Sequence, residues 1–402
     1  MSGIASEGSI WGTCPLAPRE PSRVVVDPDG DLCLRVGEPR CISPQEPKQN
    51  EQEPQATNAP DFNAEEHGGA HQKPKHEHAV VVVFVVCSKT LSRASRVWKS
   101  LLYAGFTESK QPCGNNGAAW TVDLPEDNPE ALKTLLNIIH SRFEQLPKIT
   151  DLISLEDLYQ LTILTDKYDL TIVLRPWAST WLESINDSHD AWRSNQSTRD
   201  FSDLERRLWI AWELGDPQLF EGVAKYMVLY TCADASWNLQ NNTRDKAAEL
   251  FSSILEPPSL HDIVKEARLG LLEQILKPYR DAIECLLQHP ETPGFQHICV
   301  KKPVSHQLDC EVTMLGVAIR SLSWKGYWPI PAASRISESV TVFASEFKEL
   351  DLRSRMKEHR RCSAVPGIAE HIDMLLETKH IQLAESHRHH IESQAKKSGL
   401  AS

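Results

Sequence analysis

A run of β-branched and aromatic residues constrains the fold of this chain more than any other feature. Residues 80–86 have the sequence VVVVFVV, which contains no polar side chain. This composition is typical of a strand that is buried on both faces. The run is too short to cross a bilayer, because a membrane-spanning helix needs about 20 apolar residues. We therefore expect a central strand of a sheet.

The period of the apolar residues changes directly after this strand. From Leu91 to Leu102 they recur at spacings of three and four, which predicts helix. Ser88 or Thr90 is expected to cap one short helix and Ser95 a second, since each side-chain oxygen can accept a free backbone N–H of a first turn. The block is predicted to fold as strand, short helix, short helix.

Two further stretches are predicted to supply the neighbouring strands. Residues 23–37 have the sequence RVVVDPDGDLCLRVG, in which a turn sequence, DPDG, separates two short apolar runs. We expect a β-hairpin there. Residues 119–124 are expected to form another strand. The central strand is predicted to pair with both the hairpin and this later strand.

Composition and charge bound the class of protein. The chain has 402 residues, enough for two or three domains. Its 43 Lys and Arg against 55 Asp and Glu give a formal net charge of -12, which argues against nucleic acid and anionic membranes as partners. The partners are expected to be proteins. No secretory signal is recognisable, so we expect an intracellular protein of the cytoplasm or nucleus with mostly reduced cysteines.

Two stretches are too polar to form a core. Residues 1–22 lack any periodicity and are expected to be a flexible leader. Residues 38–79 are rich in Pro, Gln, Glu, Asn and His, and such a stretch cannot bury enough apolar area to offset the loss of chain entropy. We expect this second stretch to be a disordered insertion.

The rest of the chain is predicted to be mainly helical. Asn128 followed by Pro129 is a typical helix start, and Ser154 with Asp157 resembles a capping box. Gly215 is expected to end one helix, and a long helix is expected to begin near Ser259. The tryptophans recur at helical spacings and are predicted to belong to the core; they include Trp177, Trp181, Trp209 and Trp212.

Read in order, these segments resemble the BTB/POZ domain in its fungal form. The matching stretches are VVVDPDGDLCLRVG, FVVCSKTLSRASRVWKSLLYAGFTES, WTVDLPEDNPEALKTLLNIIHSRFEQLP and SLEDLYQLTILTDKYDLTIVLRPWASTWLESI. The resemblance covers residues 23–185 apart from the insertion, and extends more loosely into the helical C-terminal half. It implies an α+β fold: a BTB/POZ domain, in which a small sheet joins a helical bundle, followed by a mainly α-helical region.

The resemblance also implies a function. BTB/POZ domains are protein-interaction modules, so the chain is expected not to be an enzyme. In members that recruit cullin ubiquitin ligases, an apolar residue followed two positions later by Glu lies just after the second short helix. Phe106 and Glu108 occupy that place. The implied role is a substrate adaptor for a cullin ubiquitin ligase. The alternatives are a scaffolding homo-oligomer without a ligase role and, for Phe106, a side chain that covers the core.

One set of residues in the C-terminal half has metal-ligand character, namely Cys299, Cys310, His359 and Cys362. Three thiolates and one imidazole suit tetrahedral zinc, and His359 and Cys362 are separated by one helical turn. Two interpretations stay open: a structural zinc site and four separately packed side chains. His297 and His306 are possible substitute ligands. No motif of a nucleotide-binding or hydrolytic enzyme is present.

The predicted organisation has four parts. A leader over residues 1–22 is followed by the BTB/POZ domain over 23–185, a helical region over 186–290, and a helical C-terminal region over 291–402 that contains the candidate zinc ligands. Within this last region His387, His389 and His390 lie in a polar stretch and are expected to form a solvated helix face.

Overall fold

The computed structural model describes most of the chain, which divides into two compact units, residues 1–146 and 147–402. The described residues are 21–37, 81–109, 119–146, 148, 151–194, 201–241, 248–301, 303, 305–378 and 381–401. The predicted leader up to residue 20 and the predicted insertion lie outside them. The chain is mixed α+β and mainly helical, as expected. Residue 185, the expected end of the first domain, lies in a helix of the second unit.

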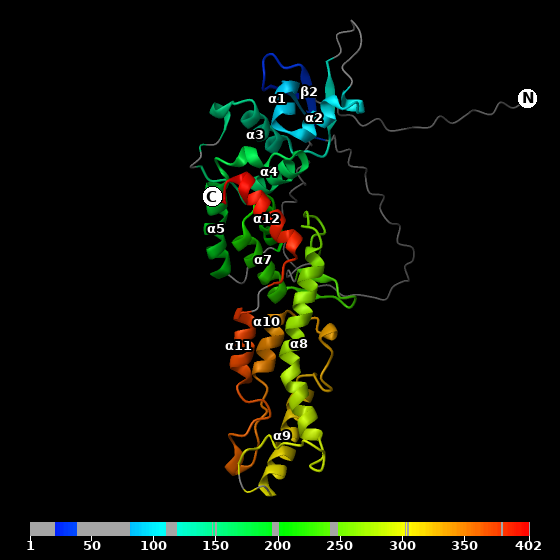
Figure 1. Cartoon of the computed structure of the whole chain (residues 1–402), viewed down its shortest axis with the longest axis vertical. Helices are drawn as coiled ribbons and strands as arrows, with labels where there is room; N and C mark the ends of the chain where they lie inside the picture. The colour runs from blue at the N-terminus through cyan, green and yellow to red at the C-terminus, as the bar shows by residue number, and fades with distance from the viewer. Residues whose placement is uncertain are drawn as a thin grey trace, which may run out of the picture. The chain divides into compact units, whose positions relative to one another are not determined.

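The first unit contains a four-stranded sheet with short helices beside it (Figure 1). Its elements are β1 (Ser22–Val25), β2 (Leu32–Val36), β3 (Val82–Val86), α1 (Ser88–Ala94), α2 (Arg96–Tyr103), η1 (Thr107–Ser109), β4 (Thr121–Leu124), α3 (Pro129–Ile139) and η2 (Phe143–Gln145). The spatial order of the strands is β1-β3-β2-β4. The predicted central strand is therefore confirmed, because β3 has a neighbour on each side.

The predicted hairpin over residues 23–37 is wrong. β1 and β2 do not pair, because β3 lies between them, parallel to β1 and antiparallel to β2. The pairing of the central strand with the later strand is also wrong, since β4 runs parallel to β2. The physical reason is burial: β3 is the most apolar strand, and the centre of the sheet covers both its edges and both its faces.

Local signals around β3 are largely as expected. The Ser95 hydroxyl accepts the backbone N–H of Trp98 and so caps α2. Ser88 does not act as a cap; its backbone N–H and its hydroxyl both donate to the carboxylate of Asp31, at 2.8 and 2.7 Å. These bonds fix the start of α1 to the loop before β2. Trp98, on α2, is fully buried.

The second unit is mainly helical (Figure 1). Its elements are α4 (Leu155–Tyr168), η3 (Thr171–Leu174), α5 (Ala178–Ser194), α6 (Phe201–Leu214), α7 (Pro217–Tyr230), β5 (Cys232–Ala233), β6 (Leu239–Asn241), β7 (Ala248–Glu249), α8 (Leu260–Leu287), α9 (Ser305–Trp324), η4 (Ala333–Arg335), α10 (Val340–Lys348), η5 (Lys357–His359), α11 (Ile368–Thr378) and α12 (Glu385–Ser398). The predicted tryptophans, Trp177, Trp181, Trp209 and Trp212, are all buried.

The last helix, α12, returns to pack against α6. Gly215, at the end of α6, has a φ of +80°, and a Cβ there would lie 2.1 Å from the backbone nitrogen of Ala395 in α12. Only glycine allows this approach. The carboxylate of Glu213 accepts hydrogen bonds from Thr165, Thr171 and Gln394, at 3.0, 2.6 and 2.6 Å. This buried carboxylate therefore joins α4, η3 and α12 to α6.

The solvated histidine face predicted for α12 is wrong for two of its three residues. His387 is buried and its Nε2 lies 2.7 Å from the carbonyl oxygen of Pro258. The His390 ring stacks on Trp212 with ring centroids 3.8 Å apart. His389 is exposed as expected. The histidines that pack do so because α6 presents an aromatic surface to α12, which the local polarity of the sequence does not reveal.

No helix in the described part of the chain combines the length and the apolar character needed to cross a membrane.

Candidate metal centre and interaction segment

The four predicted metal ligands lie together in the second unit. Cys299 comes from the loop after α8, Cys310 from the first turns of α9, and His359 and Cys362 from η5 and the turn that follows it. Their ligand atoms all lie within 4.8 Å of one another. Cys299 and Cys310 are fully buried and His359 is 2% exposed. The structure therefore brings together residues up to 63 positions apart in the sequence.

The distances within the cluster suit a single ion. The Cys299 and Cys362 sulfurs are 3.8 Å apart, and the His359 Nδ1 lies 3.2 Å from the first and 3.7 Å from the second. Metal–sulfur bonds of about 2.3 Å place the corners of a tetrahedron about 3.8 Å apart. The cluster could therefore hold one metal ion at its centre.

Polar groups outside the cluster fix its position. The Glu311 carboxylate accepts the backbone N–H of Cys299 at 3.1 Å and contacts His297 Nδ1 at 2.9 Å. The Gln307 side-chain amide donates to the Cys299 carbonyl at 2.7 Å. The His297 ring is therefore paired with the Glu311 carboxylate, and His306 is exposed. Neither substitute ligand joins the cluster. Glu311 and Gln307 were not predicted, because a lone polar residue on a helix gives no signal of what it supports.

In the absence of a cation, burial keeps the thiols of the cluster protonated. Burial, with the neighbouring sulfurs, raises the pKa of the Cys310 thiol to about 12. Burial and the nearby Cys299 sulfur also raise the pKa of Cys362. Without a positive charge at the centre, thiolates here are unfavourable, since several negative groups would share one dry site. A divalent ion would supply that charge.

Few large apolar side chains pack around the cluster. Its buried core consists of Cys299, Cys310 and Met314, with Leu286, Ile298, Met356 and Cys362 partly buried against it. None of these is aromatic. A tetrahedral ion would replace the missing hydrophobic contacts as the link between α9 and the segment after α10.

The predicted interaction segment lies just after α2 in the first unit. Phe106 is 55% exposed, and Glu108 is half-buried in η1. The backbone around them is held by two hydrogen bonds: the Trp120 indole N–H donates to the Glu108 carbonyl at 2.7 Å, and the Ser109 hydroxyl donates to the Leu101 carbonyl at 2.8 Å. The alternative that Phe106 covers the core does not fit this exposure. The segment presents an apolar ring on a fixed backbone.

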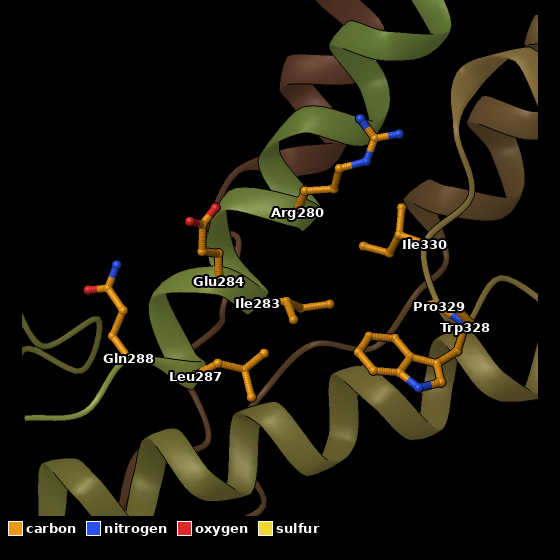
Figure 2. Close-up of a pocket in the computed structure, with 8 residues that line it drawn as sticks. All are labelled: Arg280, Ile283, Glu284, Leu287, Gln288, Trp328, Pro329 and Ile330. Atoms are coloured by element: carbon orange, nitrogen blue, oxygen red, sulfur yellow. The ribbon is translucent and has the colours of Figure 1, made fainter.

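A pocket of about 360 Å³ lies at the C-terminal end of α8 (Figure 2). Ile283 and Leu287 face Trp328 and Ile330 across it, whereas Glu284 points away from the cavity. The Arg280 guanidinium lies at one end, donates to the Pro331 carbonyl at 2.7 Å and forms an ion pair with Glu273. The pocket is therefore apolar, and none of its lining residues belongs to the cysteine–histidine cluster.

Comparisons with known proteins add no assignment to this geometry. No protein-family model matches the chain, and neither a curated protein nor a solved structure is similar to it at a significant level.

Proposed function

We propose that residues 23–185 act as a BTB/POZ protein-interaction module that recruits a cullin ubiquitin ligase, with the helical region after it serving as the adaptor for a substrate. The proposal rests on the resemblance of the sequence and on one observation, the exposure of Phe106 on a fixed backbone. An exposed aromatic ring is costly to leave in water and gives a large gain when a partner's pocket covers it.

Glu108 is proposed to set the orientation of the bound partner. Its carbonyl is held by the Trp120 indole, so the side chain leaves the backbone at a fixed point two residues from Phe106. A carboxylate beside an apolar anchor selects partners with a basic group next to an apolar pocket and disfavours acidic surfaces. The pair therefore combines an anchor with a charge that sets orientation.

The test compares two variants with matched controls. Phe106→Ala and Glu108→Lys should each weaken co-elution of the full chain with a purified cullin at least tenfold. Phe143→Ala changes a ring that is 59% exposed elsewhere in the first unit, and Glu126→Lys changes an exposed carboxylate. Both controls should bind as the unaltered chain does.

Thermal unfolding should be the same for all four variants, since none of these side chains is buried. Co-elution that survives both Phe106→Ala and Glu108→Lys contradicts the proposal. Absence of any cullin binding, together with a stable homo-oligomer, supports the alternative function of a scaffold without a ligase role.

A second function concerns the cysteine–histidine cluster: we propose that Cys299, Cys310, His359 and Cys362 bind a structural zinc ion. The observation that carries this is the set of sulfur–sulfur and sulfur–nitrogen distances of 3.8, 3.2 and 3.7 Å. The four side chains would supply all four ligands of a tetrahedral ion, which is typical of structural rather than catalytic zinc.

Elemental analysis of the purified full chain should find one zinc per chain. Cys362→Ser should lower this content by at least half, whereas Cys33→Ser, which alters a thiol in β2, should leave it unchanged. Cobalt introduced in place of zinc should show the visible absorption of a tetrahedral thiolate site. A chain that folds with all four residues present and holds only traces of metal contradicts this assignment.

A further inference from the structure

Helix α9 carries an apolar stripe on its solvent side. Leu308 is 45% exposed and Val312 is 64% exposed, while Leu315 and Ile319 are half-buried. These four residues follow one another at intervals of four, three and four. That spacing is the seam of a two-stranded coiled coil, in which apolar residues recur every 3.5 positions on average.

The stripe is separate from the face that α9 buries within its own subunit. The buried residues of α9 are Gln307, Cys310, Glu311, Met314, Ala318 and Leu322. This inner face contributes Cys310 and Met314 to the core of the cysteine–histidine cluster, and α9 also contacts α8. The two faces are about 100° apart around the helix, because each residue advances the helix by about 100°. Among the described residues, one face of α9 is buried within the subunit and the second stays partly or largely exposed.

Gly316 gives an independent indication of a neighbour. It lies inside α9, next to the stripe, where glycine costs about 1 kcal/mol relative to alanine. A Cβ at this position would meet no described atom within 4 Å, so packing within the part of the chain that the structure describes does not require glycine there. A residue without a side chain does, however, let another helix approach closely.

The arrangement of the stripe suits a second copy of the same helix in the opposite direction. Its four positions are symmetric about a point between residues 313 and 314. Antiparallel pairing therefore places Leu308 opposite Ile319 of the second copy, and Val312 opposite Leu315. Each copy uses the same surface, as a twofold interface requires.

The charges beside the stripe complement each other only in this direction. Asp309 and Arg320 lie on the same flank of the stripe, near its opposite ends. The Arg320 guanidinium lies over the Trp324 ring, 4.3 Å from its centroid, which limits the directions it can take. Antiparallel pairing puts this flank of both copies on one side of the seam and brings Asp309 near Arg320 of the second copy. Parallel pairing would put the two flanks on opposite sides and keep Asp309 and Arg320 about 16 Å apart along the helix axis.

We propose that α9 pairs antiparallel with α9 of a second copy of this chain through Leu308, Val312, Leu315 and Ile319. This surface lies outside the segment that contains Phe106. The dimer therefore forms whether or not that segment binds a cullin.

Sedimentation or light scattering of the full chain should give the mass of a dimer at micromolar concentration. Val312→Asp should weaken this dimer at least tenfold, because it buries a charge in the seam. Val342→Asp is the matched control: Val342 is 50% exposed on α10 and lies outside the stripe. Phe106→Ala should leave the dimer intact, which separates this test from that of the cullin proposal.

A charge exchange tests the direction. Asp309→Arg and Arg320→Asp should each weaken the dimer, since each places like charges together. The double variant restores an opposite pair and should restore the dimer. A monomer at all concentrations, or a dimer unaffected by both Val312→Asp and the single charge reversals, overturns the proposal. Unchanged thermal unfolding of Val312→Asp confirms that this variant folds.

Discussion

The Glu213 carboxylate accepts hydrogen bonds from Thr165, Thr171 and Gln394, none of which carries a charge. Burial dominates and raises its pKa from 4.5 to about 7, and nearby Asp166 adds to the rise. Hydrogen bonds from Thr171, Thr165 and Gln394 act in the opposite direction because they stabilise the charged form. The packing of α12 on α6 therefore includes a group that titrates near neutral pH.

This shift makes stability depend on pH. Between pH 4.5 and about 7 the folded chain holds a proton on Glu213 that the unfolded chain has lost, so stability falls as pH rises through this window. Glu213→Gln replaces the carboxyl group with an amide that stays uncharged at every pH in this range. The variant should therefore be more stable than the unaltered chain, by roughly 3 kcal/mol at pH 8 and by little at pH 4.5. Urea unfolding at both pH values measures this. An equal difference at the two pH values contradicts the expectation. The control is Glu221→Gln, which changes an exposed carboxylate on α7.

At the scale of elements, the signals that depend on neighbouring residues could be predicted from the sequence. The Asn128 side chain accepts the backbone N–H groups of Glu130 and Ala131. Ser154 caps α4 through the backbone N–H of Asp157. A helix cap involves only residues within one turn of each other, so a short stretch of sequence is enough to predict it.

The order of the strands could not be predicted in this way. A turn sequence favours a hairpin between β1 and β2, but their pairing competes with β3, which is more apolar and covers more surface when it lies between them. Residues Val36 and Val82 are partners across a long stretch of sequence. Local turn chemistry contains no information about such a competitor.

The junction of α6 and α12 gives a prediction at this scale. Gly215→Ala should destabilise the chain by more than 2 kcal/mol, because the new Cβ meets the Ala395 backbone at 2.1 Å in a left-handed residue. Gly222→Ala in α7 is the matched control. A Cβ there meets no atom within 4 Å, so this change should stabilise by about 0.5–1 kcal/mol. Urea unfolding separates the two, and changes of the same sign would contradict the argument.

For the molecule as a whole, the second unit is held in two different ways. Around α6 it relies on large aromatic side chains and a buried polar network, whereas around the cysteine–histidine cluster its core is small. The residue types of the cluster could be predicted from the sequence, since cysteine and histidine are the ligands of zinc. Their convergence could not, because Cys299 and Cys362 meet only through the packing of α8, α9 and η5.

Removal of the metal should therefore affect one part of the second unit first. After treatment with a strong chelator, hydrogen exchange should accelerate in residues 296–310 and 352–364, while α6 and α12 stay protected. Thermal unfolding should gain an earlier transition. Addition of zinc should reverse both effects. Uniform acceleration across the second unit, or no change after the metal is gone, would contradict this division of roles.

The pairing of β2 with β3 has a consequence for how the length of the segment between the two strands can vary. Val36 and Val82 are direct partners in the ladder, so the chain leaves the sheet and re-enters it at neighbouring positions. The entropy of closing a loop grows only with the logarithm of its length, about 0.6 kcal/mol for each doubling. Insertions and deletions between these two residues therefore change the stability of the sheet little. Between these two residues, evolution, or an engineer adding a sensor domain, can lengthen the protein while the strand register is kept.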